Sequence, residues 1–267
     1  MSHRGRGVPL VAALLALVAV AFFVLPLVGL LVRTPWSDVW DTLSDPAARD
    51  AMRLSLECSL WSTGLSLLFG VPLAYVLARV AFPGRALVRA LVVLPMVLPP
   101  VVGGIALLFA FQRYHGLVGG WIYDTFHFQF TFSKWGVVLA ETFVAMPFLI
   151  ITVEGALRSA DQGFEEAAAT LGAKPMTVFR RVTLPLVAPS LGAGAVLCWA
   201  RALGEFGATI TFAGSFPGQT ETMPIAVYYA LENDPDAAIA LSLVLLVISI
   251  AVLVSLRDHW LRGGSVA

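Results

Sequence analysis

The chain contains six apolar segments that are each long enough to cross a lipid bilayer as a helix. A membrane-spanning helix needs about 20 apolar residues. Because 58% of the residues are hydrophobic and 13% are charged, little of the chain is left for a soluble domain. We therefore expect an all-α, polytopic membrane protein that forms one domain over residues 1–267. The expected spans cover about residues 8–32, 54–78, 86–111, 135–157, 186–212 and 237–256.

The basic residues predict how these spans are oriented. Cytoplasmic segments of membrane proteins carry an excess of Lys and Arg. With the N-terminus inside, most of the basic residues lie inside, which predicts that both termini are cytoplasmic. The formal net charge of zero gives no sign of a nucleic-acid partner. The expected inner residues are Arg4, Arg6, Arg79, Arg85, Arg89, Arg158, Lys174, Arg180, Arg181, Arg257 and Arg262, and the outer ones are Arg33, Arg49, Arg53, Arg113 and Lys134.

A polar, charged stretch separates the fourth and fifth spans. Glu165 and Glu166 favour a helix N-terminus, and Gly172 is the expected residue just past a helix end. A second short helix is expected over residues 174–183, with Pro185 stopping it. Two short helices joined at a glycine would form a compact knob that another protein could approach closely. On periodicity alone, an amphipathic loop that lies on lipid headgroups is an equal alternative.

The same stretch, residues 158–186, carries a motif with several fixed positions. It resembles the EAA loop in permease subunits of bacterial ABC importers. The resemblance implies that ATP-binding subunits dock on this loop and hold the ATP. It also implies a homodimer with the path along its two-fold axis, and an extracytoplasmic binding protein that delivers substrate to the outer loops. The residues of the motif are Glu166, Ala167, Ala168, Gly172, Leu184 and Pro185.

Prolines and glycines interrupt the third span. They are Pro95, Pro99, Pro100, Gly103 and Gly104. Proline removes amide donors and kinks a helix, so the freed carbonyl groups must face protein or a water-filled cavity. This pattern favours a helix that lines the translocation path, and a kink used only for packing is the alternative.

The fifth span contains two opposite charges, Arg201 and Glu205. They are four residues apart, on one face of a helix, where they can neutralise each other. A structural ion pair and a role in transport are equally good interpretations. The run from Ala200 to Phe212, with the following residues 217–220, is similar to molybdate permeases and less so to sulfate permeases. The resemblance implies an oxyanion substrate: molybdate is the preferred interpretation, and tungstate and sulfate are the alternatives.

The sequence holds no motif for an energy source of its own. A phosphate-binding loop needs Gly-Lys followed by Ser or Thr, but the two lysines, Lys134 and Lys174, follow Ser133 and Ala173. Neither cysteine belongs to a metal-ligand cluster. We expect a chain that is not an enzyme and binds no cofactor or metal. The other hypotheses are an ion-gradient carrier that uses Glu141 or the charged pair in span five, and a membrane scaffold that transports nothing.

Overall fold

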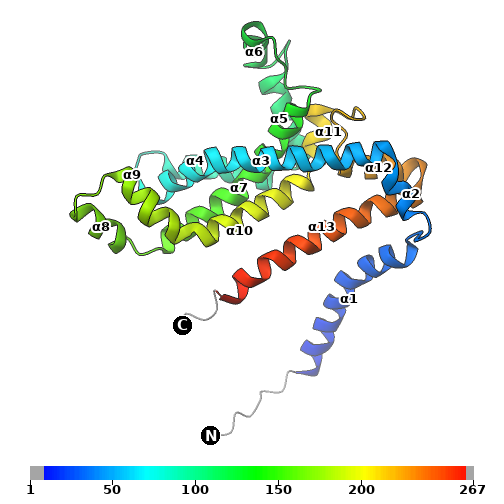
Figure 1. The fold of residues 1–267 in the computed structure, drawn as a ribbon, viewed down its shortest axis with the longest axis horizontal. Coiled ribbons are helices and arrows are strands. Elements are labelled where there is room, and N and C mark those ends of the chain that lie inside the picture. Colours follow the sequence, from blue (N-terminus) through cyan, green and yellow to red (C-terminus); the bar gives the residue numbers. More distant parts are fainter. Residues whose placement is uncertain (1–8, 263–267) are drawn as a thin grey trace.

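The computed structural model describes residues 9–262, with side chains as far as Val254, and every regular element in this part of the chain is a helix (Figure 1). The all-α prediction is confirmed. Arg4 and Arg6, and the side chains of Arg257 and Arg262, lie outside the described part. Five helical stretches within it are long and apolar enough to cross a membrane: Leu10–Arg33, Pro46–Arg79, Lys134–Ser159, Pro175–Leu203 and Pro235–Val254.

Three long helices form the centre of the molecule and run side by side along its long axis (Figure 1). The middle one, α7, buries most of its length between the other two. Small residues let the helices approach closely, as in other membrane bundles. A Cβ atom at Gly194 of α10, for example, would lie 3.2 Å from Leu149 and Thr152 of α7. These helices are α3 (Pro46–Arg79), α7 (Lys134–Ser159) and α10 (Leu184–Leu203).

Helix α3 begins well before the expected residue 54. Asp45 accepts a hydrogen bond from the amide of Ala47, and Pro46 occupies the first helical turn. Such a cap and a proline at this position both stabilise a helix start. With 34 residues, α3 is about 51 Å long at 1.5 Å per residue and reaches from one end of the molecule to the other.

The remaining helices are shorter or lie outside the centre. As expected for the loops between spans, α2, α6 and α12 are brief. Helix α13 returns along the bundle from the α12 end (Figure 1). Their bounds are α2 Val39–Ser44, α6 Gly119–Phe126, α12 Met223–Asn233 and α13 Pro235–Arg262.

Two of the predicted spans are broken. The third divides into α4 (Arg85–Val97) and α5 (Pro100–Phe111), because Leu98 is extended, as a residue before proline tends to be. The break is sharper than the predicted kink, and α5 leaves the direction of the bundle (Figure 1). The prediction of a continuous fifth span was wrong, since α10 ends at Leu203 and a separate helix, α11 (Gly207–Ala213), follows.

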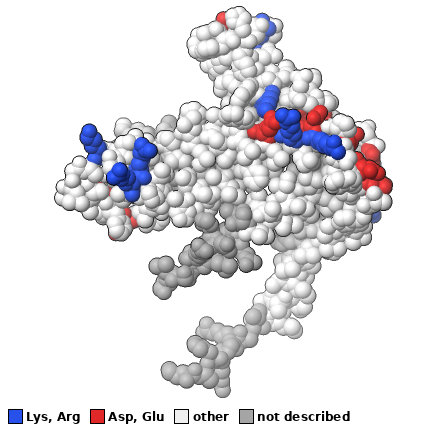
Figure 2. Space-filling model, in the orientation of Figure 1, with Lys and Arg blue, Asp and Glu red and all other residues white. Residues whose placement is uncertain are grey.

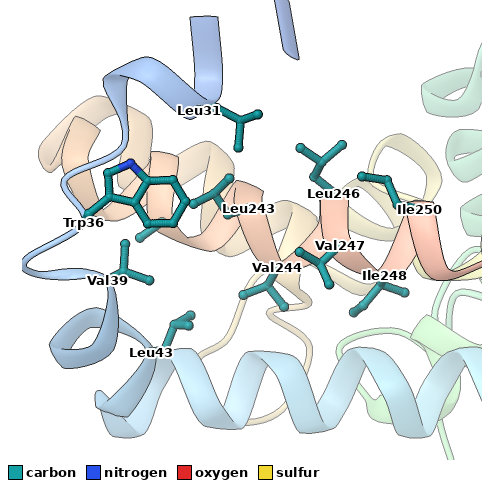
Figure 3. A pocket seen from close by; sticks show the side chains of 11 residues that line it. Leu31, Trp36, Val39, Leu43, Leu243, Val244, Leu246, Val247, Ile248 and Ile250 are labelled. Carbon is teal, nitrogen blue, oxygen red and sulfur yellow. The ribbon is translucent and has the colours of Figure 1, made fainter. Parts of the chain in front are cut away.

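Helix α1 (Leu10–Arg33) lies apart from the bundle, and none of its residues is buried. Where its end approaches α13, an apolar groove opens between α1, α2 and α13 (Figure 3). Trp36, Val39 and Leu43 form one side of the groove, and Leu243 and Val247 lie on the other. A helix that is apolar all round and unburied in one chain needs lipid or another protein against it.

Candidate functional site

The stretch with the motif forms two short helices at one end of the molecule (Figure 1). They are α8 (Gly163–Thr170) and α9 (Pro175–Val178). Gly172 has φ +83°, a left-handed conformation that glycine adopts without strain. Its amide donates to the carbonyl of Ala169 at 2.9 Å, and the amide of Ala173 donates to Ala168 at 3.1 Å. These bonds close the end of α8, so the predicted helix end at Gly172 is confirmed.

The motif residues lie mostly on the surface of this end. Glu166, Ala167 and Gly172 are exposed, and Ala168 is half-buried. The large apolar side chains of Phe164, Leu171 and Met176 are also exposed. We call the surface of α8, α9 and the turn between them the coupling knob. The sequence analysis missed Phe164 and Leu171, although an apolar residue in a polar loop is itself a sign of a contact surface.

Basic residues lie beside the apolar part of the coupling knob. Lys174, Arg180 and Arg181 are exposed, and Figure 2 shows Lys and Arg gathered at this end of the molecule. The opposite end carries mixed charges, including Arg53 and Lys134, which both pair with Glu57 (Figure 2). An apolar surface with a charged rim is typical of protein interfaces.

Pro185 does not stop the second helix, contrary to the prediction. The chain continues from α9 through a π-helical turn, η1 (Phe179–Thr183), directly into α10. The amide of Leu184 bonds to the carbonyl of Phe179, five residues back. A π-helical turn is wider than an α-helical one. Pro185 lies directly after it, in the first turn of α10, a position at which a helix tolerates the missing N–H of proline. Leu184 is half-buried, and Pro185 is exposed.

Glu165 connects the coupling knob to two spans. Its Oε1 accepts a hydrogen bond from Nη2 of Arg79, the last residue of α3, at 3.0 Å. The same oxygen accepts one from Oγ1 of Thr183, in η1, also at 3.0 Å. The sequence analysis placed Glu165 only at a helix N-terminus and missed both contacts.

A second buried carboxylate holds the first half of the broken third span. Glu154 of α7 accepts hydrogen bonds from Arg89 of α4 and from Nε of Arg158, the latter at 3.0 Å. The Glu154 side chain is almost fully buried. The pair with Arg89 attaches α4 to the bundle near the end that carries the coupling knob, and Arg158 adds a pair within α7.

The two broken spans meet beyond their breaks. A Cβ atom at Gly104 of α5 would lie 2.8 Å from the carbonyl oxygen of Ala208 in α11, and one at Gly207 would lie 2.9 Å from Pro100. The α5 and α11 backbones therefore touch, which only small residues permit. Gly103 faces Phe143 of α7. Of the predicted prolines, Pro95 stays inside α4, while Pro99 and Pro100 begin α5.

We expect Gly104→Ala to destabilise this contact by about 1–3 kcal/mol, the usual cost of overpacking. The added methyl would lie 2.7 Å from Cβ of Thr211, and the backbone of α11 leaves it no room to move. Thermal melting of the purified protein in detergent measures the effect. Gly64→Ala is the matched control, because a Cβ there meets nothing within 4 Å. Equal melting of the two variants would contradict the prediction.

Arg201 and Glu205 do form the predicted ion pair, with Nη2 2.6 Å from Oε2. They do not share one helix face, however, because Glu205 lies in the break between α10 and α11. Its Oε1 accepts a hydrogen bond from the amide of Ala208 at 2.9 Å, in the first turn of α11. With 1% of its side chain exposed, Glu205 joins the end of one helix to the start of the next.

Glu141, the other acidic candidate, is buried in α7, and its Oε2 has no hydrogen-bond partner among the described residues. Helix α11, which begins just after Glu205, packs against α7. The acidic candidates of spans four and five thus lie in the helical bundle, whereas the motif residues lie at the coupling knob.

Comparison with known proteins gives consistent matches. The family of binding-protein-dependent transport system inner membrane components matches residues 70–263, which include the coupling knob and both breaks. The molybdenum transport system permease protein ModB of Mycobacterium tuberculosis H37Rv is 47% identical over 252 residues, 94% of each chain. The sulfate transport system permease protein CysT of Salmonella typhimurium LT2 is 35% identical over 239 residues, 89% of this chain and 86% of that protein.

The fold has a close counterpart among solved structures. A chain of a bacterial ABC transporter involved in the import of the acidic polysaccharide alginate superposes with a TM-score of 0.73 and covers 96% of each chain. The sequences are 22% identical. At that level the match supports the arrangement of the helices alone.

Proposed function

Because the chain belongs to the family of binding-protein-dependent transport system inner membrane components, we propose that it is the permease through which an ABC importer moves molybdate into the cell. The observation that carries the substrate is the 47% identity to a molybdenum permease over 94% of both chains, against 35% for a sulfate permease. The run from Ala200 to Phe212 favours the same substrate. Tungstate and sulfate are the alternatives to be tested.

Two copies of the chain would form the permease, with the path along their two-fold axis. The wholly exposed, apolar α1 leaves a surface that lipid or a second copy would cover. We take residues 1–267 as a single permease domain with a coupling loop over residues 158–186.

ATP-binding subunits would dock on the coupling knob and hold the ATP. The contact would use the motif, and the exposed apolar residues with their basic rim support a protein partner there. A binding protein would deliver the substrate at the α12 end. The residues proposed for coupling are Glu166, Ala167, Ala168, Gly172, Leu184 and Pro185.

This arrangement also orients the chain. ATP is cytoplasmic, so the end with the coupling knob would face the cytoplasm, in agreement with its gathered basic residues (Figure 2). The five long helices and the broken third span would together make six spans, and an even number places both termini on that side. The protein is a multi-pass inner membrane component, with both ends proposed to be cytoplasmic.

The path, or the packing that shapes it, would run along the broken spans. A guanidinium attracts a dianionic substrate. When the guanidinium is paired with the Glu205 carboxylate, it binds the substrate only weakly, and conduction requires weak binding. Arg201, with its side chain 28% exposed, fits that description. The residues proposed here are Pro95, Pro99, Pro100, Gly103, Gly104, Arg201 and Glu205.

Uptake by proteoliposomes that contain the permease, its ATP-binding subunits and its binding protein tests the function. We expect molybdate to accumulate in vesicles whose complexes are right-side-out, with the binding protein outside and ATP inside, and not to accumulate without ATP. Competition by tungstate and by sulfate ranks the substrates. Accumulation driven by an ion gradient, in vesicles with this chain alone, would instead establish a secondary carrier.

A further inference from the structure

Neighbouring acidic residues of α8 have opposite environments. Glu166 is exposed on the coupling knob, whereas Glu165 turns inward onto Arg79 and Thr183. Successive side chains of an α-helix point about 100° apart, so one short helix presents one carboxylate to a partner and the next to its own spans. We call Glu165, Arg79 and Thr183 the Glu165 clamp.

The Glu165 clamp is shielded from water. The side chains of Arg79 and Glu165 are 7% and 15% exposed, and Thr183 is buried. By contrast, the side chains of the Arg53 and Glu57 pair at the other end are 79% and 36% exposed. Charge-assisted hydrogen bonds away from solvent are stronger than exposed ones.

Arg79 depends on Glu165 for its charge compensation. Its Nε and Nη1 atoms are buried without a hydrogen-bond partner in the described part of the chain. Removing one partner of a buried ion pair leaves the other charge uncompensated. The ion pair therefore fastens the first turn of α8 to the end of α3.

The two partners of Glu165 lie at the ends of elements that extend through the molecule. Arg79 ends α3, which runs to the opposite end of the molecule, where Oγ of Ser55 accepts a hydrogen bond from the amide of Met223 at 2.7 Å. Thr183 ends η1, which continues into α10 and so to Arg201 beside the break. Helix α8 otherwise packs mainly against η1 and α9.

We propose that Glu165 is the positioning residue that carries motion of the coupling knob into spans α3 and α10. The proposal rests on the function proposed above, in which ATP-binding subunits move the knob. Glu166 would then belong to the contact with the partner, and Glu165 to the transmission of movement inside the permease.

The test is the amount of molybdate transported per ATP hydrolysed by the whole complex in proteoliposomes. Glu165→Gln keeps the size of the side chain and an acceptor for Thr183 but removes the charge that holds Arg79. We expect the complex to assemble and hydrolyse ATP, with transport per ATP reduced about tenfold, within the usual range of coupling between sites. Thr183→Val removes the hydrogen bond that the hydroxyl donates to the Glu165 carboxylate and should reduce the ratio about fivefold.

Thr152→Val is the matched control for Thr183→Val, because it makes the same change at a threonine whose hydroxyl donates to the carbonyl of Phe148 in its own helix, α7. It should leave the ratio unchanged. An Arg79→Met and Glu165→Gln double variant should be no worse than Arg79→Met alone, since both act through one contact.

An unchanged ratio in the assembled Glu165→Gln complex would overturn the proposal, and so would a proportional fall of transport and hydrolysis. If the Glu165→Gln complex fails to assemble, the amount of molybdate transported per ATP by the Thr183→Val complex takes its place, and an unchanged value there overturns the proposal. Failure of the proposed function looks different, because the wild-type complex itself would then carry no molybdate. The same ratio is in that case measured with tungstate or sulfate, whichever the wild type carries.

Discussion

We expect a Gly172→Val variant to enter the membrane normally but to lose ATP-driven uptake. Gly172 has φ +83°, and a Cβ there would meet nothing within 4 Å. The loss therefore comes from backbone strain and not from a clash: a residue other than glycine in this region costs about 1–3 kcal/mol, and a β-branched one is the least tolerant. We therefore expect the turn between α8 and α9 to relax to another conformation in which the coupling knob no longer presents its motif.

Co-purification of the ATP-binding subunits and uptake by the reconstituted complex measure this effect. We expect weakened association and no accumulation. Gly172→Asn is the control, because asparagine tolerates the left-handed region and should retain most of the uptake. A Gly172→Val complex with undiminished association and normal uptake would contradict the role assigned to the turn.

Replacing Arg201 by Met destabilises the protein by about 3–5 kcal/mol, because it leaves the carboxylate of Glu205 buried without its partner. Glu205→Gln is expected to be milder. A glutamine can still accept the hydrogen bond from the amide of Ala208, and the Arg201 side chain, 28% exposed, can reach water. In detergent, the melting temperature of Arg201→Met should therefore be lower than that of Glu205→Gln.

The double variant Arg201→Met with Glu205→Gln removes both charges, and we expect it to melt above Arg201→Met. Uptake by this variant then separates the two interpretations of the pair. Restored uptake assigns it a structural role, whereas a stable protein without uptake places Arg201 in the path. If Arg201→Met melts with the wild type, the buried pair does not stabilise the break between α10 and α11.

The apolar runs and the local turn signals were sufficient to predict much of this fold. Long runs without charge can satisfy their backbone in lipid only as helices, and Gly172 ends α8 as its position predicts. The boundaries depended on contacts that such patterns do not show. Helix α3 starts early because of Asp45, and α10 passes Pro185 because of the π-helical register of η1.

The break at Glu205 and the buried ion pairs could not be predicted in the same way. A spacing of four residues suits a continuous helix, so Arg201 and Glu205 gave no sign of an interruption between them. Glu165 and Arg79 are 86 residues apart. The charge pattern placed Arg79 at an inner end of a span but could not identify the helix that meets it there.

The π-helical turn at residues 179–183 fixes the angular phase between the coupling knob and span five. It adds a residue to one turn of an otherwise continuous helix, which rotates everything before it by about 100° relative to everything after it. The same side chains joined by an unbroken α-helix would present the knob in a different direction from Arg201. The direction in which the coupling knob points, relative to Arg201, thus depends on the number of residues in η1 and not on their identity alone.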